Sequence, residues 1–71
     1  MIPITTREQE ILQLISQGYS SKEIAASLFL SNHTIESHRK NLLIKLEAQN
    51  VAHMVTKGFE YGCLRIQSLQ L

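Results

Sequence analysis

Residues 20–46, SSKEIAASLFLSNHTIESHRKNLLIKL, contain the pattern that decides the fold. Ser20 and Glu23 have the spacing of a capping box, in which each side chain satisfies the other residue's free backbone N–H, and this spacing predicts a short helix over 21–28. Ser31 offers the same capping chemistry and predicts a longer helix over 32–46. A short helix, a tight turn and a longer helix together describe the helix-turn-helix unit.

The segments on either side of this unit are also predicted to be helical. Thr5 and Glu8 form a second capping box, and Gly18 suits the left-handed position that ends a helix, so we expect a first helix over 6–17. Asn50 and Gly62 bracket a fourth helix over 51–61 in the same way, whereas the tail, 63–71, has no clear apolar period. The sequence therefore predicts an all-α fold, a four-helix helix-turn-helix bundle that forms one domain over 1–71.

The composition argues against a disulfide-linked, metal-binding or membrane-spanning protein. The chain has 71 residues, a net charge of +1 and a single cysteine, Cys63, so it has no internal disulfide. The three histidines lie in no cluster with metal-ligand spacing, and we expect neither a metal nor another cofactor. No apolar run approaches the roughly 20 residues of a membrane span, and the N-terminus lacks a signal-peptide layout. With a lone thiol, these features predict a soluble cytoplasmic protein.

Catalysis has little support in the sequence. The chain contains no aspartate, which excludes an aspartate-based catalytic triad. It also lacks a glycine-rich phosphate loop and a nucleophile elbow. We therefore expect no enzymatic activity and no catalytic residue.

The helix expected over 32–46 has two different faces. At about 100° per residue, Ile35, Leu42 and Leu46 fall on one face, which we assign to the core. An α-helix fits the major groove of B-DNA, and periodicity alone leaves open whether the opposite face reads DNA or is only solvated. That opposite face is mostly polar and presents His33, Glu36, Ser37, Lys40, Asn41 and Ile44.

If this face reads DNA, its charged residues have defined partners among the bases. Lys40 can donate to guanine O6 or N7, and Glu36 can accept from cytosine N4. Ser37 is short and specifies no particular base.

The run ITTREQEILQLISQGYSSKEIAASLFLSNHTIESHRKNLLIKL, residues 4–46, resembles the LuxR-type output domain. The pattern of that family is roughly L-T-x-R-E…G-x-S-x-K-E-I-A…L-x-x-S-x-x-T-V-x-x-H…K-L. The resemblance extends over about residues 4–58 without a gap, and it implies four helices, of which the third enters the major groove and the fourth helps to pair two domains on DNA. The matching positions are Thr5, Arg7, Glu8, Gly18, Ser20, Lys22, Glu23, Ile24, Ala25, Leu28, Ser31, Thr34, His38, Lys45 and Leu46.

The resemblance also implies which residues contact DNA. The family's base-contacting positions fall on Glu36, Ser37 and Lys40, in agreement with the helical wheel. Its phosphate-contacting positions fall on Lys22 and on His33 and Thr34 in the first turn of the third helix, where free backbone N–H groups favour an anion. Many relatives carry lysine where this chain has Glu36, so Glu36 is expected to shape sequence preference rather than to add affinity.

Five other residues receive individual predictions. Arg39 projects partly inward, yet its long stem can reach the phosphates. Lys45 either complements the dipole at the end of its helix or contacts a phosphate. His38, near the inward edge of the helix, is expected to be packed and hydrogen-bonded rather than to contact DNA. Tyr19 and Phe29 are assigned to the core.

The fourth helix sets the expectation for assembly. Val51, Val55 and Phe59 are expected to pack on the core and His53 to lie at the surface, and the remaining sides are too polar for an obligate dimer. The expected partners are therefore double-stranded DNA and a second copy, paired weakly through this helix with Lys57 near Glu60 across the axis.

The expected function is sequence-specific DNA binding within a bacterial transcription regulator, such as the output domain of a response regulator. Receiver domains of response regulators carry a phosphoacceptor aspartate, which these residues lack. Two other interpretations remain open. One is a protein-interaction module, because similar helical units in sigma factors bind RNA polymerase; the other is a purely structural bundle.

Overall fold

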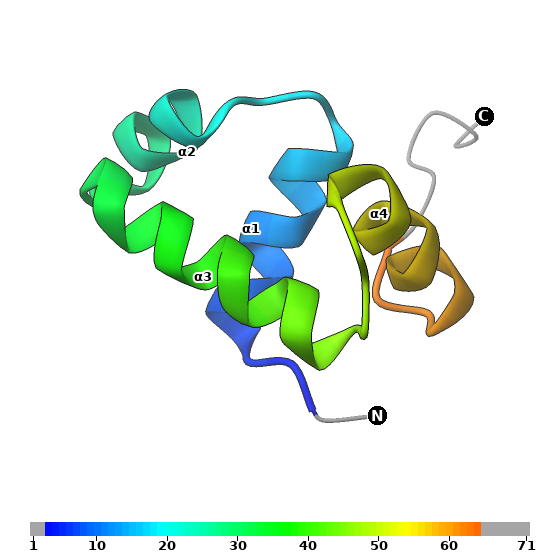
Figure 1. The fold of residues 1–71 in the computed structure, drawn as a ribbon. Helices are drawn as coiled ribbons and strands as arrows, with labels where there is room; N and C mark the ends of the chain where they lie inside the picture. Colours follow the sequence, from blue (N-terminus) through cyan, green and yellow to red (C-terminus); the bar gives the residue numbers. More distant parts are fainter. Residues whose placement is uncertain (1–2, 65–71) are drawn as a thin grey trace, which may run out of the picture.

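The computed structural model describes residues 3–64, and this part of the chain forms four helices and no strand. The helices are α1 (Thr6–Ser16), α2 (Ser21–Leu28), α3 (Asn32–Lys45) and α4 (Val51–Glu60). Helix α3 crosses α1, with α2 beside its first turns and α4 beyond its other end (Figure 1). Every helix begins at the predicted residue, and three of the four end one residue earlier than predicted.

Each helix begins after a residue whose side chain caps it. Thr5 and Ser20 form the two predicted capping boxes; in the first, Glu8 N donates to Thr5 Oγ1 at 3.1 Å and Thr5 N donates to Glu8 Oε1 at 2.9 Å. Ser31 and Asn50 accept from backbone N–H groups at the starts of α3 and α4. Because these contacts join residues three apart, local sequence is sufficient to fix where the helices start.

All four helices end at a residue of positive φ, which turns the chain away from the helix axis. Gly18 and Gly62 occupy this position after α1 and α4, as the sequence predicts. After α2 and α3 the position is held by Phe29 (φ 58°) and Glu47 (φ 54°), although the left-handed conformation disfavours residues that carry a side chain. The prediction that Phe29 is a core residue is wrong, because this turn directs its ring outward and leaves it 95% exposed.

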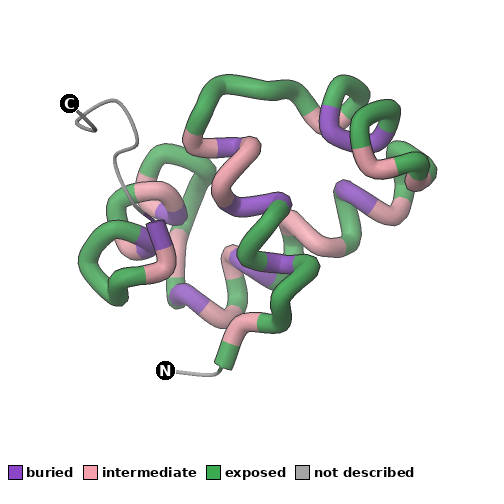
Figure 2. The backbone as a smooth tube through the Cα atoms, turned by 180° about the vertical axis from the view of Figure 1, so that it is seen from behind, coloured by how far each residue is buried: buried purple, intermediate pink, exposed green. Residues whose placement is uncertain are grey.

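The core is built from the inward faces of the helices and one residue beyond α4. Ile35 and Leu42 of α3 and Leu46 directly after it are fully buried, so the predicted inward face of this helix is confirmed. Figure 2 shows buried positions recurring along the inner sides of the helices, with exposed positions between them. The buried apolar residues are Ile11, Leu12, Ile15, Ile24, Ala25, Ile35, Leu42, Leu46, Met54 and Leu64.

Helix α4 turns only part of its predicted face to the core. Met54 and Gly58 are buried and Val55 packs against the core as predicted, whereas Val51 and Phe59, which are also predicted to pack there, are 37% and 41% exposed. The chain returns after α4 and places Leu64 against Gly58, where the Cβ of any larger residue would lie only 2.7 Å from Leu64 Cδ1. Because only the side of α4 that carries Gly58 can approach Leu64 so closely, that side faces the core. Val51 and Phe59 therefore lie toward the surface.

Two further side chains differ from their predicted environments. Tyr19, assigned to the core, is 48% exposed because it lies in the connection between α1 and α2, directly after Gly18. His53, expected at the surface, is half-buried, and its Nδ1 accepts a hydrogen bond from Gln49 N at 3.1 Å. Both differences arise at helix ends, where the path of the connecting chain decides exposure.

Candidate nucleic-acid interface

The outward face of α3 is exposed along its length. His33, Glu36, Ser37, Lys40 and Asn41 are all exposed, and the apolar Ile44 that ends this face is 62% exposed. The opposite face is fixed in the core through three fully buried side chains. Helix α3 therefore presents a mostly polar surface on a rigid support, which is the arrangement required of a helix that enters a groove.

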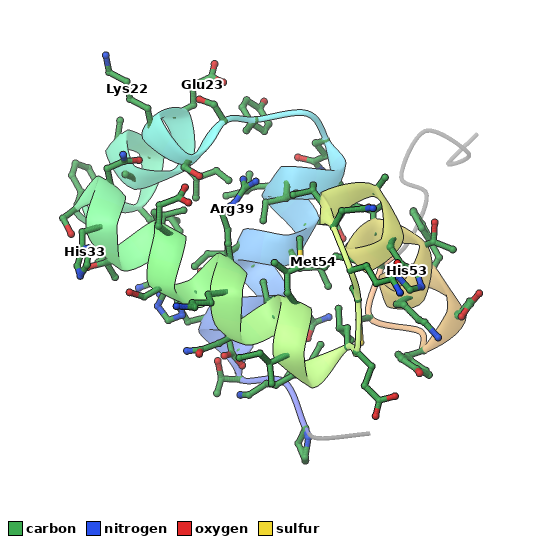
Figure 3. All side chains as sticks on the ribbon, in the orientation of Figure 1. Lys22, Glu23, His33, Arg39, His53 and Met54 are labelled. Carbon is green, nitrogen blue, oxygen red and sulfur yellow. The ribbon has the colours of Figure 1, made fainter. Side chains whose placement is uncertain are left out.

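The starts of α2 and α3 carry the predicted phosphate contacts. Lys22 and His33 are exposed, and Figure 3 shows both side chains extending away from the body of the molecule. Thr34 is half-buried, with its hydroxyl 2.8 Å from Ser31 Oγ and its N–H donating to the same oxygen at 3.0 Å. The cap occupies only some of the N–H groups in the first turn of α3, so the others are left to meet an anion.

Arg39 lies on the flank of α3 rather than on its outward face. Its side chain is 22% exposed, and its Nε lies 3.9 Å from Glu36 Oε1. In Figure 3 the Arg39 side chain points from α3 toward the side where α1 and α2 lie. A contact between Arg39 and a phosphate would therefore compete with this ion pair to Glu36.

Lys45 joins the end of α3 to the start of α1. Its Nζ lies 2.6 Å from Glu8 Oε1, the same oxygen that accepts from Thr5 N. Glu8 is 3% exposed, and burial alone would raise the pKa of its carboxyl group. Hydrogen bonds from Lys45 and Thr5, together with the positive charge of Lys45, outweigh burial and leave the pKa of Glu8 below its ordinary value.

The sequence identifies Glu8 as a capping residue but does not reveal its ion pair. Glu8 and Lys45 are 37 positions apart, and no local pattern joins them. Both belong to the matched positions of the LuxR-type pattern, which is the only sequence signal that includes the two residues together. The pair gives Lys45 a structural role in addition to the helix-dipole interaction that the sequence suggests.

His38 is half-buried, as expected, but its ring is not hydrogen-bonded as expected. Its Nδ1 is buried and has no hydrogen-bond partner within residues 3–64.

Neither a metal site nor a membrane span is found in the described part of the chain. Residues 3–64 contain no group of three or more histidine, cysteine, aspartate or glutamate side chains that is arranged to hold a metal ion. Over the same residues, no helix has the length and hydrophobicity needed to cross a bilayer.

Comparison with known proteins identifies the family. The profile of "Bacterial regulatory proteins, luxR family" matches residues 3–57, which include α1, α2, α3 and most of α4. The chain belongs to the luxR family of bacterial regulatory proteins. Domains of the luxR family bind DNA and regulate transcription, and they are not enzymes. The four-helix fold and the absence of an enzymatic function were both predicted from the sequence, and both are confirmed.

Three proteins illustrate what this chain is similar to. The chain is 41% identical to the "Uncharacterized response regulatory protein YgeK" of Escherichia coli (strain K12) over 63 residues, which cover 89% of this chain and 43% of YgeK. The structure of the transcription factor GerE has a TM-score of 0.83 and 32% identity, and the match covers 87% of this chain and 92% of GerE. The crystal structure of a Vibrio cholera VqmA–ligand–DNA complex has a TM-score of 0.80 and 25% identity, covering 89% of this chain and 28% of VqmA.

The extent of these matches differs between the relatives. The chain spans less than half the length of the curated relatives that it matches, YgeK among them, but nearly all of the GerE chain. The shared part is therefore the helix-turn-helix domain.

Proposed function

We propose that this domain reads a specific DNA sequence by inserting α3 into the major groove. The observation that carries the proposal is the contrast between the two sides of α3: three fully buried apolar residues on one side, and an exposed polar face on the other. Glu36, Ser37 and Lys40 would contact bases. The VqmA structure, which contains DNA, supports this interpretation for a domain of the same fold.

The phosphate contacts in this proposal come from the starts of two helices. Lys22, His33 and Thr34 would meet the DNA backbone, with backbone N–H groups of α3 beside them. Arg39 and Lys45 are predicted to contact phosphates as well, but each already pairs with a carboxylate, so we propose that they contribute less than Lys22.

A salt titration tests the proposal. The net charge is only +1, so we expect weak binding by a single domain, and its affinity should fall as salt rises because phosphate contacts release counterions. The measurement is the affinity for duplex DNA at low and at physiological salt. An affinity that does not change with salt would exclude binding through phosphates.

We also propose that two copies pair weakly through α4 on DNA. Val51, Phe59 and Tyr61 leave apolar surface partly exposed on and after α4, and the exposed polar residues Thr56 and Glu60 of the same helix make this surface too polar for a permanent dimer. Lys57 Nζ lies 3.9 Å from Glu60 of its own chain and 5.6 Å from the centroid of the Tyr61 ring. On pairing, Lys57 would exchange Glu60 of its own chain for Glu60 of the second copy. If both α3 helices enter adjacent major grooves, the half-sites should lie about 10 bp apart.

Sedimentation with and without a palindromic duplex tests this pairing. We expect a monomer without DNA and two copies on the palindrome. The variant Lys57→Glu should weaken the second binding event more than the first. A tight dimer in the absence of DNA, or one copy per palindrome, would contradict the proposal.

We further propose that the domain is the output part of a cytoplasmic response regulator and acts on RNA polymerase. The support is the similarity to YgeK, which is named a response regulatory protein. Transcription from a promoter that carries the selected site, measured with purified polymerase and with or without this chain, tests the effect on polymerase. No change in transcript level would count against it.

A further inference from the structure

Glu36 has two cationic neighbours one helical turn ahead of it, Arg39 and Lys40. On an α-helix, a glutamate four residues before a lysine is well placed to pair with it, so the sequence allows either neighbour to take the carboxylate. In the structure Glu36 Oε1 lies 3.9 Å from Arg39 Nε. Lys40 forms no ion pair with any residue in the range 3–64. Glu36 therefore pairs with Arg39, on the flank of α3, and not with Lys40.

The environment of Arg39 explains why Glu36 pairs with it rather than with Lys40. Its side chain is 22% exposed while that of Glu36 is 57% exposed, so the arginine is the more restricted partner. The long stem of Arg39 runs along the flank of α3 toward α1 and α2 (Figure 3). A guanidinium whose stem is already held loses less side-chain entropy on pairing than the exposed ammonium of Lys40 would.

This pairing has consequences for a helix that enters a groove. A carboxylate between two rows of phosphates is repelled unless a cation is near it, and Arg39 supplies that cation. The pair uses Oε1 of Glu36, so Oε2 and the remaining lone pairs are left to accept hydrogen bonds. Lys40 keeps all three of its N–H donors.

We propose that Arg39 is a positioning residue for base reading: it holds Glu36 ready to accept from the N4 amino group of a cytosine, and it keeps Glu36 away from Lys40, which donates to a guanine. The inference rests on the proposed insertion of α3 into the major groove. Glu36 and Lys40 are four residues apart, about 6 Å along the helix axis, and base pairs are about 3.4 Å apart. Each half-site should therefore contain a cytosine and a guanine about two base-pair steps apart.

The experiment is selection of bound duplexes from a library with a randomised half-site, followed by affinity measurements on the selected and on random-sequence DNA. The full 71-residue chain is used as wild type and as the variants Glu36→Gln, Arg39→Met and Arg39→Lys. Methionine keeps an apolar stem on the flank of α3 and removes the charge, and lysine restores the charge. Thermal unfolding of each variant confirms that it is folded.

The proposal predicts a distinct pattern for each variant. Glu36→Gln should change the preferred base at one position from cytosine to adenine and leave the guanine preference unchanged. Arg39→Met should reduce discrimination at both positions, by between about 5-fold and 150-fold, because the released Glu36 captures Lys40. Arg39→Lys should restore most of that discrimination.

The double variant Glu36→Gln with Arg39→Met separates positioning from phosphate contact. With no carboxylate to capture Lys40, removing Arg39 should cost no further guanine discrimination, so the two changes should not be additive. If Arg39 instead contacts a phosphate, Arg39→Met will weaken binding to all sequences equally, in both backgrounds, and lower the slope of affinity against salt by about one. That result, or an unchanged cytosine preference in Glu36→Gln, overturns the proposal.

The same measurements distinguish failure of this inference from failure of the proposed function. Lys22→Ala serves as the matched control for a phosphate contact and should weaken all sequences alike. If the wild type selects a sequence but the Arg39 variants behave like Lys22→Ala, only the positioning role is lost. If the wild type shows neither selection nor salt-dependent binding, the DNA-reading function and the inference fail together.

Discussion

The two sides of α3 each carry one ion pair, and the two pairs differ in almost every physical respect. On the core side, Lys45 Nζ lies 2.6 Å from a Glu8 carboxylate that is 3% exposed, and the partners are 37 positions apart. Toward the outward face, Arg39 Nε lies 3.9 Å from a Glu36 carboxylate that is 57% exposed, and the partners are three positions apart. The same chemistry therefore occurs once in a buried, fixed geometry and once in a loose, solvated geometry.

This difference separates what holds α3 from what α3 offers to a partner. A buried carboxylate that loses its cation pays a desolvation cost, so the core-side pair fixes the end of α3 against the start of α1. An exposed pair contributes little to stability because water screens both charges. The atoms of the outward pair thus stay available for a ligand at small cost to the fold.

The largest effect should come from the apolar residues on the core side. Leu42→Ala should lower the free energy of unfolding by about 2–5 kcal/mol, because it leaves a cavity where a fully buried side chain stood. The neighbouring Asn41→Ala, on the exposed face, should be nearly neutral. Urea denaturation of both variants measures the difference, and equal losses would contradict the assignment of the two sides.

Breaking the core-side pair should have the next largest effect. Lys45→Met keeps the stem but leaves the buried Glu8 carboxylate without its cation, which should cost about 1–3 kcal/mol of stability at neutral pH. Lys22→Met, at an exposed lysine, is the control and should be nearly neutral. Chemical denaturation of the two variants at pH 7 gives the comparison.

The cost of Lys45→Met should also depend on pH. The pKa of Glu8 is lowered in the folded state, so its ionised form stabilises the protein above the ordinary glutamate pKa of about 4.5, and this contribution is lost as the pH falls through the lower, folded value. The stability gap between the wild type and Lys45→Met should therefore narrow when unfolding is followed from pH 6 down to pH 3. A gap that stays constant over this range would mean that Glu8 does not carry the effect.

On the outward face, the expected changes are in binding rather than in folding. Lys40→Ala should relax preference at one base position and cost about 1–3 kcal/mol of binding free energy on the best site. Lys22→Ala should weaken all sequences roughly equally, because a phosphate contact carries no sequence information. Competition binding with single-base variants of the site measures both. If Lys22→Ala changed the sequence preference and Lys40→Ala did not, the proposed placement of α3 in the major groove would be wrong.

The smallest effect is expected from the outward ion pair itself. Glu36→Ala should change the free energy of unfolding by no more than about 1 kcal/mol, since a solvated pair at 3.9 Å gains little from its Coulomb attraction. Thermal unfolding in low and in high salt checks this. A loss as large as that of Lys45→Met would remove the contrast between the two sides of α3.

Local sequence predicted the parts of this fold that depend on neighbours in the chain. The caps at Thr5, Ser20, Ser31 and Asn50 all form, because each joins residues that are three apart. Helical periodicity likewise placed Ile35, Leu42 and Leu46 on the buried side of α3. The assignment of Glu36, Ser37 and Lys40 to base contacts, and of Lys22, His33 and Thr34 to phosphates, stays a prediction.

Other predictions failed where apolar character was taken as sufficient evidence of burial. Phe29 and Tyr19 are large and apolar in part, yet both follow helix ends where the backbone turns them outward. Val51 and Phe59 have the right spacing to pack on the core, but the residue that meets the returning chain at Leu64 is Gly58. Hydrophobicity alone does not say which side of a short helix a later segment will cover.

The sequence by itself determined the starts of the four helices, the inward side of α3 and membership of the luxR family, because capping contacts and helical periodicity act over three to seven residues. Only the tertiary structure decided that Glu8 meets Lys45, that Gly58 faces the core and that Glu36 pairs with Arg39 rather than Lys40. The first two contacts join segments brought together by folding. The third depends on how far the surrounding helices restrict each side chain, and that restriction does not exist until the helices have packed.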